Sequence, residues 1–386
     1  MTEGAQQQSI ATWRSWFPVT EQAVHLNHAG VSPISIPVAE AVRAFLEDAL
    51  RIDAERYRRW ESKSEEVRRL CALLIGARPE QIAFVKNTSE GLSLVAAGLA
   101  WREGDNIVAV DGEYPSNVYP WWAQRERGVE VRMVSRHNGL VRPEDVEAAC
   151  DRRTRVVAVS FVDWSTGARN PLRLLAQVAH RYGALFVVDG IQGVGVVPLH
   201  VAEEGLDCLA VGGHKWLLAP EGCGWLYLSD RALGEVGSVL HGWKSVTDAD
   251  RYLPYHFDPR PDALRFEPGS PPHLGIHALG AAVKLLLDVG VETVWERVRV
   301  VNDYLVERLR KIGASVLSPW REDQRSGIVV FRCAAEAAKL VDELNRRGFI
   351  VRLRNGGVRA APHFYTSEEE LERFVAAVAA LSGTHA

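Results

Sequence analysis

The chain has 386 residues, of which 47% are hydrophobic and 24% are charged, a composition typical of an ordinary globular protein. Its formal net charge of −4 gives no electrostatic reason to expect a nucleic-acid or anionic-membrane partner. The five cysteines are scattered without a CxxC pair, which argues against a zinc site and a disulfide framework. Residues 1–13 do not read as a signal peptide, and no apolar stretch approaches the roughly 18 residues that span a bilayer, so we expect a cytoplasmic location.

In chain order, residues 1–30 form an N-terminal segment that ends in a polar break, and a helical pattern follows from residue 37 to about 75. Beyond it, short apolar runs alternate with helical patterns such as those over 89–100 and 171–182. The apolar runs cover residues 82–85, 107–110, 129–134, 156–161, 185–188, 208–211 and 224–228. This alternation predicts an α/β fold whose mostly parallel, seven-stranded sheet is covered on both faces. We expect this large domain to span residues 31–265.

The alternation of apolar runs and helical patterns stops at residues 234–272, which are rich in Pro, His and Trp. Loops this long are often functional. The pattern after them reads helix, helix, strand, helix, short strand and helix. It predicts a small C-terminal α+β domain over residues 266–386, with the segment 1–30 packing near it.

Two chemically reactive side chains follow neighbouring apolar runs. Asp189 ends one run, where a buried carboxylate needs a partner, and Lys215 follows the next run 26 residues later. Taken alone, Asp189 is more often a helix cap or an ion-pair partner, and Lys215 is more often a surface residue. Together they match the demands of pyridoxal 5′-phosphate (PLP), which needs an aspartate to keep its ring nitrogen protonated and a lysine to form an imine with it.

A phosphate site is predicted where the run 82–85 is followed by Asn87, Thr88, Ser89, Glu90 and Gly91, which open a helix. A helix N-terminus offers free N–H groups and the positive end of a dipole, and the two hydroxyls add donors. The alternative interpretation is a simple capping box.

The chain resembles the class V aminotransferase family of fold-type I PLP enzymes, which includes cysteine desulfurases, kynureninases and isopenicillin N epimerase-like proteins. The resemblance runs from about Leu26 to the C-terminus. It rests on the motifs NTSEG (87–91), EYPSN (113–117), VVDGIQ (187–192), GGHKW (212–216), RFEPGS (265–270) and VRAAPHFYTS (358–367).

The resemblance implies how the cofactor is held. Thr88 and Ser89 bind its phosphate together with His214, although Gly212 replaces a serine donor of the family. Tyr114 stands where desulfurases carry a histidine stacked on the ring. Gln192 is expected to reach the ring 3-oxygen.

Other matching positions concern the substrate and the assembly. Arg359 matches the arginine that grips the α-carboxylate of a small amino-acid substrate. Ser270 matches a residue that reaches the phosphate of a partner subunit, which implies a homodimer with shared sites. Asp163 lies in the segment that contacts the ring oxygen, although Phe161 fills the place of the family's asparagine there. Asn27 and His28 fall where the family's N-terminal loop lines the substrate pocket, with a loop-capping role as the alternative.

One departure concerns the loop before Arg359, where desulfurases carry a catalytic cysteine. Here the loop shrinks to residues 355–358 and holds no sulfur, so we expect no enzyme persulfide. The expected activity is PLP chemistry at Cα of an amino acid, of the class V aminotransferase type, with Lys215 as general base. A β-lyase or an epimerase is the alternative, because the same groups support all three reactions. A dinucleotide-binding oxidoreductase and a catalytically silent binding protein are disfavoured, the first because no GxGxxG motif is present and the second because Asp189 and Lys215 are both intact.

Overall fold

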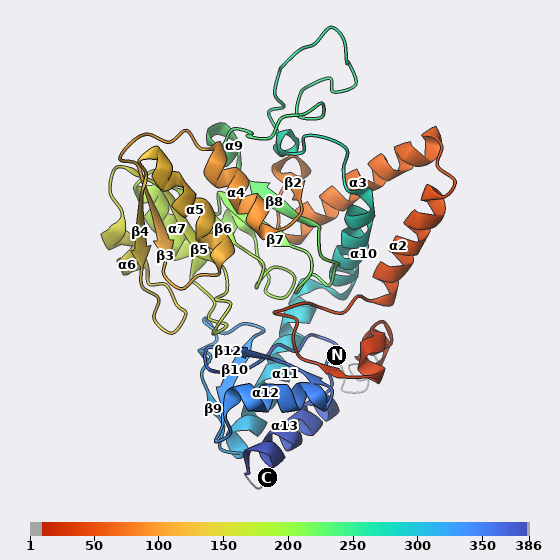
Figure 1. The fold of residues 1–386 in the computed structure, drawn as a ribbon, viewed down its shortest axis with the longest axis vertical. Helices are drawn as coiled ribbons and strands as arrows, with labels where there is room; N and C mark the ends of the chain where they lie inside the picture. Colours follow the sequence, from red (N-terminus) through yellow and green to blue (C-terminus); the bar gives the residue numbers. More distant parts are fainter. Residues whose placement is uncertain (1–9, 384–386) are drawn as a thin grey trace.

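The computed structural model describes residues 10–383 and consists of a large α/β part and a smaller C-terminal part (Figure 1). A seven-stranded sheet forms the centre of the large part, with the order β2-β8-β7-β6-β5-β3-β4. Its strands are β2 (Ile82–Val85), β3 (Asn106–Val110), β4 (Glu130–Val134), β5 (Thr154–Ser160), β6 (Leu185–Asp189), β7 (Cys208–Gly212) and β8 (Gly224–Leu228). Only β8 runs antiparallel to its neighbours β7 and β2. The predicted mostly parallel, seven-stranded sheet is therefore confirmed.

Both faces of this sheet are buried. Successive side chains of a strand point to opposite sides of the sheet, so neighbouring residues of one strand pack in different cores. Val187 packs in a core with helices α4 (Thr88–Gly98), α5 (Tyr119–Trp122) and α9 (Asp230–Glu235). Val188 packs in a core on the other face with α6 (Pro143–Ala149), α7 (Leu172–Arg181) and the long helices α3 (Ala54–Leu74) and α10 (His273–Val289). This two-sided burial explains why the strands read as continuous apolar runs.

The helical pattern after residue 37 forms two helices, α2 (Ile36–Ala49) and α3, which are separated at Asp53. The Asp53 side chain accepts a hydrogen bond from the backbone N–H of Arg56 and so starts a new helix. The irregular stretch after α9 forms a loop that projects from the large part (Figure 1). The short helices are α8 (Val201–Glu204), η1 (Pro18–Glu21), η2 (Pro79–Gln81), η3 (Pro115–Asn117), η4 (Ala123–Arg127) and η5 (Ala263–Phe266).

The small part contains a four-stranded sheet in the order β12-β13-β10-β9. Its elements are α11 (Val291–Lys311), β9 (Ser315–Val316), β10 (Val329–Arg332), α12 (Ala337–Arg346), β11 (Phe349–Ile350), β12 (Arg352–Arg354), β13 (Gly357–Ala360) and α13 (Glu368–Ser382). Strand β1 (Val24–His25) pairs in parallel with β11, and Arg14 forms an ion pair with Glu370 of α13. The N-terminal segment thus lies against the small part.

The hydrophobic cores of the two parts divide within α11. Val294 and Val298 pack in the core of the large part, whereas Val301 and Leu305 pack in that of the small part. Helix α10 packs on α2 and α3, so its side chains belong to the core of the large part. The domain boundary expected after residue 265 stays a prediction. No single helix between residues 10 and 383 has the length and apolarity to cross a membrane, and α10 with α11 meets that criterion only as a pair bent by 77°.

Candidate active site

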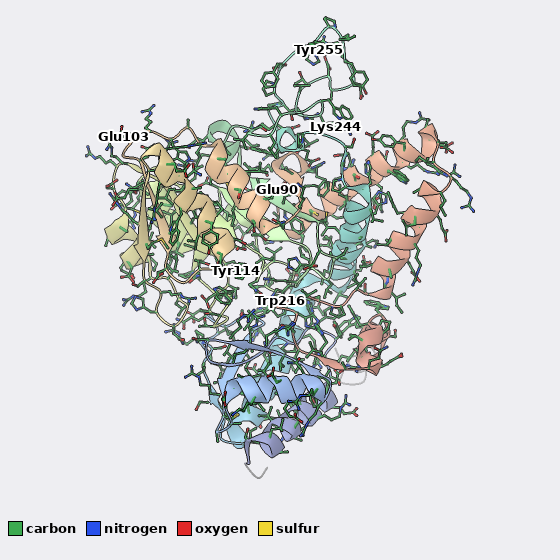
Figure 2. All side chains as sticks on the ribbon, in the orientation of Figure 1. Glu90, Glu103, Tyr114, Trp216, Lys244 and Tyr255 are labelled. Atoms are coloured by element: carbon green, nitrogen blue, oxygen red, sulfur yellow. The ribbon has the colours of Figure 1, made fainter. Side chains whose placement is uncertain are left out.

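A pocket of about 410 Å³ lies at the end of β6 and β7, at the junction of the two parts of the molecule. It is lined by the segment after β1, the start of α4, the loops that follow β6 and β7, and the hairpin of β12 and β13. Tyr114, labelled in Figure 2, lines it between the large sheet and the small part. Ligands of open α/β sheets bind at this place, beyond the carboxyl ends of the strands.

Asp189 lies at the end of β6 and Lys215 follows the neighbouring strand β7, and the two charges interact. Asp189 ends β6 and is 2% exposed, and one of its carboxylate oxygens accepts a 3.0 Å hydrogen bond from the backbone N–H of Ile191. Burial raises the pKa of Asp189 to about 6, against the opposing effect of Lys215. Burial, together with the charges of Arg359 and Arg354, lowers the pKa of Lys215 to about 8, against the opposing effect of Asp189. The pocket therefore holds a carboxylate that needs a cationic donor and an amine that is easily deprotonated.

An aromatic wall stands beside this amine. The Nζ atom of Lys215 lies 5.6 Å from the ring centroid of Tyr114, which is 45% exposed. The ring of Trp164 meets that of Tyr114 edge to face, with 5.6 Å between centroids. A flat heterocycle bound next to Lys215 finds a ring face here to stack on.

The start of α4 carries two hydroxyl groups, of which that of Ser89 forms a 2.6 Å hydrogen bond with the hydroxyl of Ser116. The helix is capped by Asn87, whose side chain accepts from the backbone N–H of Glu90, so neither Thr88 nor Ser89 is used as the cap. The hydroxyl of Thr88 is buried and has no hydrogen-bond partner among the described residues. A Cβ atom at Gly212 would lie 3.3 Å from that hydroxyl, so the glycine leaves space there. An unpaired hydroxyl and a free helix N-terminus suit a phosphate.

Arg359 is buried, and it forms no ion pair with a described acidic residue. Its guanidinium donates to the backbone oxygen of Trp164 at 2.9 Å and to the side-chain oxygen of Asn27 at 3.4 Å, and its Nε atom has no partner among residues 10–383. Burial lowers its pKa to about 9, and the neighbouring charges of Arg354 and Arg352 contribute. A buried guanidinium without a counter-charge is destabilising, and a bound anion would stabilise it.

The structure brings together most of the side chains that the sequence singled out. The pocket is lined by Asn27, Thr88, Ser89, Tyr114, Gln192, His214, Lys215 and Arg359, and Asp189 interacts with Lys215 directly behind it. Gln192 donates one amide hydrogen to the backbone oxygen of Ala29 at 3.0 Å and accepts from the indole of Trp216, which leaves its second N–H free.

Besides Asp189, three of the predicted site residues lie outside this lining. His28 is fully buried, and its ring bonds the backbone oxygen of Ala361 at 2.8 Å and the hydroxyl of Tyr365 at 2.7 Å. Asp163 accepts hydrogen bonds from Arg136 and from the two residues that follow Trp164, which fixes its own loop. Ser270 is exposed ahead of α10. Sequence reasoning missed Arg352 and Arg354, which also line the pocket.

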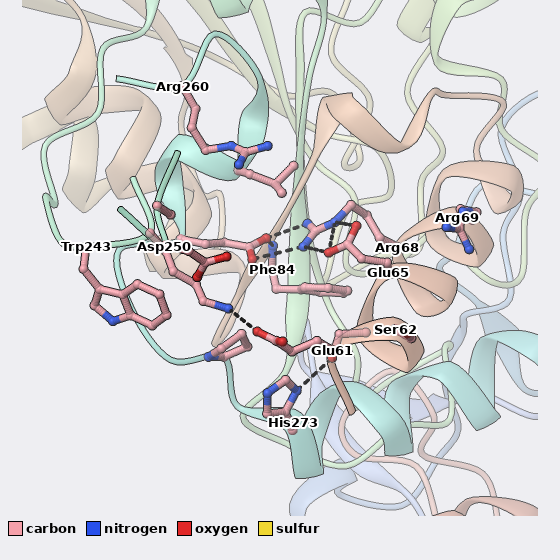
Figure 3. Close-up of a pocket in the computed structure, with 16 residues that line it drawn as sticks. Glu61, Ser62, Glu65, Arg68, Arg69, Phe84, Trp243, Asp250, Arg260 and His273 are labelled. Carbon is pink, nitrogen blue, oxygen red and sulfur yellow. Dashed lines mark hydrogen bonds and ion pairs between the residues drawn. The ribbon is translucent and has the colours of Figure 1, made fainter. Parts of the chain in front are cut away.

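A second cavity of about 500 Å³ lies under the projecting loop (Figure 3). Its buried Arg68 pairs with Glu267 at 2.6 Å and with Glu65, and Lys244 pairs with Glu61 at 2.9 Å. These charges are satisfied by one another, in contrast to those around Arg359. Arg69, which also lines the second cavity, is exposed to solvent, so the described residues place no buried, unpaired cation there.

The α/β fold and the donor set around Lys215 define a PLP enzyme: a buried carboxylate for a ring nitrogen, an amine of lowered pKa, an aromatic face and an unpaired hydroxyl at a helix N-terminus. The family described as Aminotransferase class-V matches residues 24–374, and the chain belongs to that family. Its members use PLP, so this chain is a PLP-dependent enzyme of the transaminase or lyase type, as expected from the sequence.

Two relatives and one solved structure show the range of similarity. The chain is 30% identical to a protein named probable cysteine desulfurase from Methanothermobacter thermautotrophicus, over 92% of this chain and 94% of the relative. It is 28% identical to the uncharacterized aminotransferase YcbU of Bacillus subtilis, over 95% and 97%. The apo structure of a cysteine desulfurase from Thermococcus onnurineus NA1 superimposes with a TM-score of 0.87 at 27% identity, covering 96% of this chain and 97% of that one. The expected fold-type I architecture is thus confirmed.

Proposed function

We propose that the chain acts at Cα of an α-amino acid and catalyses a transamination. The observation that carries this proposal is the buried Arg359, which has no acidic partner among the described residues and lines the same pocket as the amine of Lys215. A guanidinium fork fits the two oxygens of a carboxylate, so Arg359 would hold an amino acid by its α-carboxylate.

The cofactor would be held by groups from several elements. Its phosphate would sit at the N-terminus of α4, on Thr88 and Ser89, with His214 from the loop after β7. Asp189 would lie against the ring nitrogen, where a cationic N–H donor stabilises its charged form. Tyr114 would cover a ring face, and Gln192 would offer its free N–H to the ring oxygen. When bound, PLP supplies an electron sink for negative charge at Cα.

Lys215 would move the proton. A pKa of about 8 leaves about a tenth of the free amine uncharged at neutral pH. The Nζ atom would take the proton from Cα of the substrate and hold it for the second proton transfer of a transamination, so one residue serves both transfers. We favour transamination because Lys215 alone would suffice for it, and no additional catalytic side chain is required.

β-Elimination is the second candidate, because the relatives include probable cysteine desulfurases. No cysteine is among the described residues that line the pocket. The segment before Arg359 is a two-residue turn at Asn355 and Gly356, which joins β12 to β13. Burial raises the pKa of the thiols of Cys71, Cys150, Cys208 and Cys223, so these remain protonated. Any sulfur released would therefore leave the substrate directly.

We also propose a homodimer, in which Ser270 reaches the partner's cofactor. The loop that precedes Ser270 presents exposed apolar side chains, including Tyr252, Leu253 and Phe257, together with Tyr255 at its projecting tip (Figure 2). A cluster of exposed apolar side chains on one loop favours a surface that the partner subunit covers in the dimer. We propose a cytoplasmic location, because all five cysteines are free thiols.

The test is a panel of amino acids given to the PLP-loaded protein, with and without 2-oxo acids. Turnover that requires a 2-oxo acid supports transamination. Release of ammonia and pyruvate without an acceptor would instead establish β-elimination. Absence of α-proton exchange in heavy water with every amino acid would refute chemistry at Cα.

A further inference from the structure

Three guanidinium groups share one face of the hairpin formed by β12 and β13. Arg352 of β12 is paired directly with Arg359 of β13, and Arg354 lies two residues beyond Arg352, on the same side of the strand. The turn at Asn355 and Gly356, with φ angles of 49° and 64°, fixes this register. All three arginines line the pocket.

This arrangement of three positive charges destabilises the folded state. Like charges directly opposite each other on an antiparallel pair are destabilising. None of the ion pairs between residues 10 and 383 includes Arg352, Arg354 or Arg359. Glu221 is the one acid among the described lining residues, and its charge acts on His214. The positive charge of the hairpin is therefore not neutralised by the described residues around it.

The pocket contains more arginines than the proposed function needs for its anionic groups. In the proposed function, the phosphate lies at α4 and the α-carboxylate lies on Arg359. Arg354 packs over the ring of Trp164, 5.5 Å from its centroid, and uses one nitrogen for the backbone oxygen of Leu353. Its Nε atom is buried without a partner among the described residues, and Arg352 is exposed beside it. Two cations thus remain at the substrate end of the pocket.

We propose that Arg352 and Arg354 bind a second acidic group, so that the substrate is an amino acid with a carboxylate in its side chain. This inference rests on the proposed function, in which Arg359 holds the α-carboxylate. Arg354, fixed against Trp164, sets the direction of the side-chain carboxylate, and Arg352 closes the site from the solvent side. A neutral side chain of the same shape leaves both cations unpaired.

The experiment measures binding of L-glutamate and L-aspartate against L-glutamine and L-asparagine, by the change in cofactor absorbance of the PLP-loaded protein. We expect the acidic member of at least one pair to bind about tenfold more tightly, since charge-assisted hydrogen bonds are roughly twice as strong as neutral ones. In Arg352→Gln and Arg354→Gln this preference falls to about threefold or less, with PLP content unchanged. The matched control is Arg310→Gln on α11, which removes one exposed positive charge outside the pocket and keeps the preference.

Equal binding of the acidic and neutral members of both pairs by the unmodified protein would overturn the inference. Continued α-proton exchange with neutral amino acids would then show that the proposed function stands without it. Loss of PLP from Arg352→Gln and Arg354→Gln would also overturn it, because the arginines would then serve the cofactor. An equal loss of preference in Arg310→Gln would reduce the effect to net charge and refute a specific site.

Discussion

Replacing Arg359 with methionine is expected to stabilise the cofactor-free protein and to abolish its binding of amino-acid carboxylates. Burial and two neighbouring arginines lower the pKa of Arg359 from its ordinary value to about 9, which corresponds to a cost of about 5 kcal/mol for the charged form in the folded state. The side chain is 2% exposed, so solvent does not screen this cost. Methionine keeps much of the packing but not the bond to the backbone of Trp164. We therefore expect a net gain of about 2–4 kcal/mol.

The assay is urea unfolding of cofactor-free Arg359→Met beside the unmodified protein, with Arg310→Met as a surface control. The midpoint should rise without a change in the urea dependence of the free energy. A separate measurement uses Arg359→Lys, which keeps the charge but not the planar fork. It should bind amino acids more weakly and simple amines as before.

A lower free energy of unfolding for Arg359→Met would refute this reasoning, because Arg359 would then act as a structural residue. Equal losses of amino-acid and amine binding in Arg359→Lys would lead to the same conclusion.

Three further predictions concern the same site. Asp189→Asn should retain PLP but slow α-proton exchange in heavy water by orders of magnitude, because the ring nitrogen loses its anionic partner; near-normal exchange would contradict this role. Mixed dimers of Lys215→Ala with Ser270→Ala chains should regain one working site, whereas a fully active monomer in the ultracentrifuge would exclude a shared site. Replacing all five cysteines with alanine or serine should preserve turnover per folded molecule, and an enzyme persulfide found by mass spectrometry would contradict this expectation.

Much of the large sheet could be predicted from sequence, because its strands are buried on both faces. The apolar run 82–85 coincides with β2, and the run over 208–211 with all but the last residue of β7. The helical pattern beyond residue 37 did not reveal the break at Asp53, since local capping decides it. The sequence also did not predict that the two ends of α11 pack in different cores. The apolar face of an amphipathic helix does not show which element it packs against.

The site was harder to predict where geometry, and not residue type, decides. Asp189 and Lys215 stood out because each follows a buried strand. The sequence placed His28 near the pocket, but its ring bonds Ala361 and Tyr365. Arg352 was missed because β12 has only three residues. The dipeptide Asn355-Gly356 was the available signal, since such a turn fixes the hairpin register and sets Arg352 opposite Arg359. The catalytic and binding roles of these residues stay predictions.

The most direct test of the central claim is borohydride reduction of the PLP-loaded protein, followed by peptide mapping. The account predicts a yellow protein whose visible absorbance disappears on reduction, with the cofactor fixed to the peptide that contains Lys215. A cofactor fixed to another lysine, or no visible absorbance after loading with PLP, would contradict it.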